Sequence, residues 1–195
     1  MTTLKKIAFI VLLQGSTGQA QILNYVINPG FEKVIASYSM TSSNGVYAWS
    51  ALDSAFAGAF LCFSVNPPFL NSPNSSVGSQ YPRNGNSHIG SAFYYDNPLN
   101  NLNIRWYPRA RLKEYLDSGK IYCGRYYVVL TENTTIGIDS YGMYCGGTEL
   151  DTITYCQIPL TYLTPQISWQ GNPLVDTVNW TAVSGTFVAN GREKY

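Results

Sequence analysis

The stretch Ile121-Tyr-Cys-Gly-Arg-Tyr-Tyr-Val-Val-Leu130 is the clearest strand of the sequence. β-Branched and aromatic side chains fill it, and such side chains pack well on a pleated sheet. Asp117-Ser-Gly-Lys120 precedes it with turn-forming residues, and the polar segment 131–135 follows it. We therefore expect a turn, a long strand, and a second strand over Ile136 to Cys145.

Shorter strand-like runs lie on both sides of this stretch. Gly58 to Val65 and Ser87 to Tyr95 have the length of strands, and Val178 to Ala189 predicts two more short segments. Segment 66–78 is rich in Pro, Asn and Ser and predicts a surface loop. Short runs separated by turns predict an all-β sandwich rather than a parallel α/β sheet.

The segment before Asp117 fits two kinds of structure. Pro108 and Gly119 stand where a helix would begin and end, and the residues between them favour a helix by propensity. Arg105 to Leu112 instead alternates, which places Trp106 and Ala110 on one side of a strand. The residues by themselves leave both structures open.

Composition and the N-terminus indicate an exported protein that does not bind nucleic acid. A basic start, the apolar run Ile7 to Leu13 and a small residue at Ala20 predict a signal peptide over 1–20, with the domain over 21–195. After its removal, no apolar run reaches the roughly 20 residues that span a bilayer. A net charge of +1 provides no field for nucleic acid. We expect a secreted protein or one on the outer cell surface.

Export changes the interpretation of the four cysteines, Cys62, Cys123, Cys145 and Cys156. An oxidising compartment favours disulfides, and three pairings are open. The separation of Cys145 and Cys156 brackets a plausible loop, so we favour that bridge. No close Cys-x-x-Cys spacing indicates zinc.

Three stretches together resemble a family of secreted Bacteroidota surface domains of the galactose-binding-like, carbohydrate-binding-module type. These domains occur in gliding-motility-associated and type IX-sorted proteins. The stretches are Asn28-Pro-Gly-Phe-Glu32; Leu112 to Leu130 with Ile138 to Tyr144; and Trp180 with Ser184 to Tyr195.

The resemblance implies a jelly-roll β-sandwich and a strand, not a helix, before the Asp117 turn. Family members continue beyond the position of Tyr195, so it also implies a domain truncated at the C-terminus that lacks its last strand or strands. In similar jelly rolls a glutamate at the position of Glu32 helps to hold a structural calcium ion, which needs six to eight oxygen ligands. No other cofactor is implied.

The candidate chemistry is recognition rather than catalysis. His88 has no nucleophile motif beside it, and the carboxylates show no spacing that selects a glycosidase pair. Aromatic faces pack against sugar rings, and aromatics in loops are favoured for recognition over those in the core. We therefore predict ligand-binding roles for Trp49, Tyr81, Trp106 and Trp169, and core packing for Trp180, Tyr126 and Phe93.

The sequence thus predicts a non-catalytic module that binds a glycan or another cell-surface component, or mediates adhesion. One alternative is a structural or protein-binding domain of an envelope protein, which scattered core aromatics would favour. A third is a glycoside hydrolase or its accessory domain, which two converging carboxylates would favour.

Overall fold

The structure is a computed structural model that describes residues 23–33, 35, 46–52, 61–64, 70–75, 78–91, 95–97, 102–152 and 160–195. The predicted signal peptide over 1–20 lies outside these ranges. Within them, no helix is both long enough and apolar enough to cross a membrane.

The regular elements of the described residues are strands and one short 3-10 helix. They are β1 (Trp49–Ala51), β2 (Leu61–Ser64), β3 (Leu70–Asn71), β4 (Asn74–Ser75), β5 (Gly78–Ser79), β6 (Ser87–Gly90), β7 (Tyr95–Asn97), β8 (Leu102–Ile104), β9 (Pro108–Ala110), β10 (Ile121–Val128), β11 (Gly142–Met143), η2 (Thr148–Thr152), β12 (Ile167–Ser168) and β13 (Thr181–Val188).

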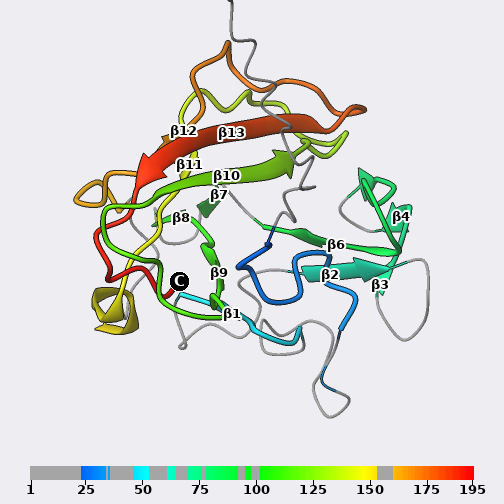
Figure 1. The fold of residues 1–195 in the computed structure, drawn as a ribbon. Coiled ribbons are helices and arrows are strands. Elements are labelled where there is room, and N and C mark those ends of the chain that lie inside the picture. Colours follow the sequence, from blue (N-terminus) through cyan, green and yellow to red (C-terminus); the bar gives the residue numbers. More distant parts are fainter. Residues whose placement is uncertain are drawn as a thin grey trace, which may run out of the picture.

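The all-β class is confirmed, but the structure does not establish a jelly-roll sandwich. The described strands pair as five two-stranded sheets and one three-stranded sheet, β3-β2-β6. Figure 1 shows the two long strands β10 and β13 side by side, with β2, β3 and β6 in a separate part of the molecule. The core is correspondingly divided into several small clusters.

The antiparallel pair β10·β13, called the ribbon below, is the longest sheet. Its register runs from Ile121 opposite Val188 to Val128 opposite Thr181. The strand predicted at 121–130 is therefore confirmed over 121–128, and its partner is the C-terminal segment. The second strand predicted over Ile136 to Cys145 is not formed as one strand, because this stretch contributes only β11 and an isolated bridge from Ile138 to Leu174.

The two short segments predicted over Val178 to Ala189 form one continuous strand. Gly185 lies opposite Gly124 in the ribbon, and both face the side chain of Ile167 on β12. The missing side chains leave space for Ile167 and for Met143 on β11, so the glycines permit close packing and do not end the strand. Ile167 is 2% exposed and belongs to the largest core cluster.

The ambiguous segment before Asp117 is extended, as the resemblance implied. β9 pairs with β1, and Leu112 bridges to Val26, so the helix favoured by propensity is not formed. Pairing with other segments outweighs the helix propensity here, because the segment gains backbone hydrogen bonds to β1 and to the stretch at Val26. The turn predicted at Asp117-Ser-Gly-Lys120 is confirmed, with Gly119 at φ +80° and a hydrogen bond from the Lys120 N–H to the Asp117 carbonyl.

The C-terminal segment 189–195 packs back into the molecule. The Leu112 N–H donates to the Lys194 carbonyl, and the Gly146 N–H donates to the Tyr195 carbonyl. The Arg109 guanidinium lies over the Tyr195 ring, 4.4 Å from its centroid, which places the C-terminus beside β9 (Figure 1). These contacts tie the end of the chain to two separate segments, the one around β9 and the one at Gly146.

Candidate functional site

Side chains alternate along the ribbon, so it has an inner, packed face and an outer face. On β13 the even-numbered residues are exposed, and on β10 the odd-numbered residues point the same way. The outer face therefore carries Arg125 opposite Ser184, and Tyr127 opposite Ala182. Because the opposite side chains on β13 are small, they leave the Arg125 and Tyr127 side chains uncovered from that side.

A loop between β5 and β6 folds over one end of this outer face. The Arg83 guanidinium carbon lies 3.5 Å from the centroid of the Tyr127 ring, in cation–π geometry. The indole N–H of Trp180 donates to the Tyr81 carbonyl at 3.1 Å, and the Tyr81 ring itself is 66% exposed. We call Tyr81, Arg83, Tyr127 and Trp180 the aromatic platform.

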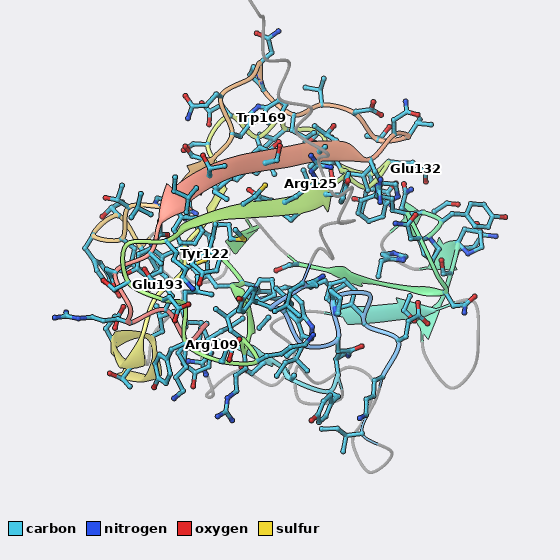
Figure 2. All side chains as sticks on the ribbon, viewed as in Figure 1. Arg109, Tyr122, Arg125, Glu132, Trp169 and Glu193 are labelled. Atoms are coloured by element: carbon cyan, nitrogen blue, oxygen red, sulfur yellow. The ribbon has the colours of Figure 1, made fainter. Side chains whose placement is uncertain are left out.

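Two carboxylates hold the platform loop at its ends. Glu32 Oε1 accepts hydrogen bonds from the Asn86 N–H at 2.6 Å and the Ser87 N–H at 3.0 Å. Glu132 Oε2 accepts one from the Ser79 N–H at 3.1 Å. Figure 2 shows Glu132 beyond the end of the ribbon and Arg125 along it. Gly85, at φ +66°, permits the turn, since a Cβ there would lie 2.4 Å from Glu32 Oε1.

His88 on β6 packs against Trp180 of the aromatic platform. Its ring meets the Trp180 ring edge-on, with centroids 5.9 Å apart. Burial lowers the pKa of His88 to about 4, because removal from water disfavours the imidazolium. At neutral pH the side chain is therefore uncharged and packs as a polar aromatic. So low a pKa also makes it a weak base, which does not favour a general-base role.

The four aromatics predicted to bind ligand lie in different surroundings. Trp49 packs on Phe31, with ring centroids 4.7 Å apart, and its indole N–H donates to the Asn28 carbonyl at 2.9 Å. Trp169 stacks on Tyr141 against the main core cluster. Trp106 is half-buried, two residues before the start of β9. Of the four, only Tyr81 lies in the platform.

Trp180 was predicted to be core and is instead half-buried in the platform. Its position continues the even-numbered, exposed series of β13, which includes Ala182 and Ser184. The alternation in the sequence could have placed Trp180 on this face. Ser184-Gly185 instead indicated a break between two short strands, and the faces of two separate strands need not coincide. Phe93, also predicted to be core, lies outside the described residues.

Glu32, the predicted calcium ligand, is surrounded by hydrogen-bond donors. Its two amide partners present hydrogens to the carboxylate, and the Ser87 hydroxyl lies 3.4 Å from Oε2. Donors of this kind suit an anion and not a cation, so they do not support calcium at this position. The described residues contain no group of three or more His, Cys, Asp or Glu able to hold a metal.

The bridge favoured between Cys145 and Cys156 is not formed, since Cys145 is a free, buried thiol. The Gln166 side chain instead pairs with the Cys145 backbone, accepting from its N–H at 2.8 Å and donating to its carbonyl at 2.7 Å. Cys123 is a free thiol on the outer face of the ribbon. Cys156 and the Cys62 side chain lie outside the described residues.

Three comparisons of this chain with known proteins gave no match. No family model matches the chain, and no curated protein or solved structure matches it.

Proposed function

We propose that this protein is a non-catalytic, exported module of the cell surface that binds glycan on the aromatic platform. The observation that carries the proposal is the exposed Tyr81 ring in the loop whose backbone accepts the Trp180 indole N–H and whose Arg83 stacks on Tyr127. Export rests on the N-terminal sequence pattern, and the type of ligand rests on the platform.

The chemistry of the platform suits a sugar. Aromatic rings can cover the apolar C–H face of a pyranose, while neighbouring polar groups take the hydroxyl hydrogen bonds. Exposed amides at Asn84 and Asn86 and the guanidinium of Arg83 lie in the same loop. An amide both donates and accepts, which matches the mixed character of a hydroxyl.

The proposed role is binding rather than catalysis, because the carboxylates beside the platform already have structural partners. Glu32 and Glu132 each accept backbone hydrogen bonds that fix the loop. A glycosidase needs one carboxyl group to donate a proton and a second to act as base or nucleophile. The platform residues, three aromatics and one arginine, supply neither role.

A glycan-array and polysaccharide-binding screen tests the proposal, with Tyr81→Ala compared with Tyr162→Ala. Both tyrosines are 66% exposed, so the control removes an equal ring away from the platform. We expect Tyr81→Ala to weaken binding roughly ten-fold or more, and Tyr162→Ala to leave it unchanged. Each variant must retain a cooperative unfolding transition. Equal effects of both substitutions, or a folded protein that binds no glycan, would contradict the proposal.

One observation favours the protein-binding alternative. Ile121 and Val188 are paired across the ribbon at its other end, and they are 73% and 63% exposed. Contiguous exposed apolar surface is typical of association sites, and this cross-strand pair would contribute to such a surface. The alternative would be favoured by a protein that binds no glycan but self-associates in sedimentation equilibrium, with association lost in Ile121→Lys.

A further inference from the structure

We infer that the glycan bound by the platform is acidic, carrying carboxylate or sulfate groups that Arg83 and Arg125 bind. The inference rests on the proposed function and specifies its ligand class. It follows from the position and the partners of the two guanidinium groups.

Arg83 presents its hydrogen-bonding edge to solvent. Its guanidinium carbon lies 3.5 Å from the centroid of the Tyr127 ring, so one face of the group is covered. The side-chain oxygen of Asn84 accepts a hydrogen bond from Arg83 Nη1 at 2.6 Å, and its amide nitrogen donates one to the Arg83 carbonyl at 2.8 Å. A guanidinium has five N–H donors in its plane, and stacking on a ring leaves these edges available for a planar anion.

Arg125 lies on the same face of the same strand as Tyr127, two residues earlier. Residues at this spacing are about 7 Å apart along a strand, so Arg125 lies on the same face as the Tyr127 ring that Arg83 covers. Arg125 is exposed and faces the small Ser184 across the ribbon. Among the residues that the structure describes, neither Arg83 nor Arg125 forms an ion pair with a carboxylate.

Two cations without a carboxylate partner among the described residues, on the same surface as aromatic rings, favour an acidic ligand over a neutral one. A neutral sugar would use the rings and leave both charges without a partner. An acidic sugar would use the rings and also form charge-assisted hydrogen bonds, which are shorter and stronger than neutral ones. Exposed pairs of this kind change affinity by roughly two- to five-fold each, and added salt weakens them.

The test compares matched polysaccharides that differ only in charge. Isothermal titration uses polygalacturonate against its fully methyl-esterified form, and dextran sulfate against dextran; the two pairs distinguish carboxylate from sulfate. The variants are Arg83→Gln and Arg125→Gln. Arg111→Gln is the control, because Arg111 is an exposed arginine on the segment after β9.

We expect one charged polymer to bind at least roughly four-fold more tightly than its neutral parent, with binding that weakens as salt rises. Arg83→Gln and Arg125→Gln should each reduce that binding roughly two- to five-fold, while Arg111→Gln leaves it unchanged. Equal losses in all three variants would indicate attraction by net charge and overturn the inference.

The outcomes separate the inference from the proposed function. If neutral and charged polymers bind equally and only Tyr81→Ala weakens them, the platform binds glycan but the charge selectivity is wrong. If a folded protein binds none of the four polymers and no arrayed glycan, both the inference and the proposed function fail.

Discussion

Replacing Glu193 with alanine should destabilise the protein more than removal of any exposed carboxylate. Glu193 is 1% exposed, and its carboxylate accepts the backbone N–H groups of its own loop. Oε1 accepts from Asn190 at 2.9 Å, and Oε2 accepts from Gly191 and Arg192 at 3.0 and 3.1 Å. The substitution removes the acceptor of all three donors at once.

The expected magnitude follows from these donors. A buried donor left without a partner costs about 1–3 kcal/mol. Asn190 and Arg192 are exposed residues, so water can replace part of what they lose. We therefore expect a loss of about 3 kcal/mol in the free energy of unfolding, out of the roughly 5–15 kcal/mol typical of a folded domain. The same loop carries Lys194 and Tyr195 into their contacts, so its release would also loosen the C-terminus.

Urea denaturation followed by tryptophan fluorescence measures this loss. Glu114→Ala is the matched control, because Glu114 is exposed, and the control should stay within about 0.5 kcal/mol of the wild type. Glu193→Gln keeps one acceptor oxygen and should lie between the two. A Glu193→Ala protein within about 0.5 kcal/mol of the wild type would refute the reasoning.

Three further predictions concern single residues. Because the pKa of His88 is about 4 in the folded protein and near 6.5 unfolded, the unfolded state binds more protons between these values. As pH drops from 7 to 5, the free energy of unfolding should therefore fall by roughly 1–2 kcal/mol more in the wild type than in His88→Gln. Urea titrations that gave the same pH dependence of this free energy for both proteins would exclude the prediction. Burial first, and the Glu193 carboxylate second, raise the pKa of Cys145 to about 11. Iodoacetamide at pH 8 should thus alkylate Cys123 in the folded protein and spare Cys145 until urea is added, and peptide mass mapping that found both thiols modified without urea would contradict the burial. Finally, a Cβ at Gly124 would lie 2.3 Å from Met143 Cε and 2.5 Å from Ile167 Cδ1, whereas one at Gly185 meets Ile167 at an ordinary 3.4 Å. Gly124→Ala should cost about 1–3 kcal/mol in thermal or urea unfolding and Gly185→Ala less than about 1 kcal/mol, and the reverse order would show that the ribbon packs differently.

Local features of the fold could be predicted from the sequence because they depend on neighbouring residues. The strand at 121–128 follows from its run of β-branched and aromatic side chains, and the Asp117 turn follows from its Ser-Gly pair. Alternation in the segment at β9 agreed with the structure where helix propensity did not. These features need no knowledge of distant parts of the chain.

Strand pairing and surface placement could not be predicted in the same way. Alternation states which residues share a face, but it does not select the partner strand, and β13 lies about sixty residues after β10. The loop predicted at 66–78 includes all of β3 and β4 and the first residue of β5, whose pairing depends on contacts with other segments. Likewise Trp49 had a loop-like sequence context, yet its ring is covered by Phe31 from another part of the chain.

The most direct test of the central claim is fluorine NMR of protein labelled with 5-fluorotryptophan, titrated with the tightest-binding glycan. The chain has four tryptophans, so Trp→Phe variants assign every resonance. Binding on the aromatic platform predicts that the Trp180 signal shifts, while the signals of Trp49 and Trp169, which pack on Phe31 and Tyr141, stay in place. A shift of Trp49 or Trp169 with Trp180 unchanged would place the ligand elsewhere and contradict the account.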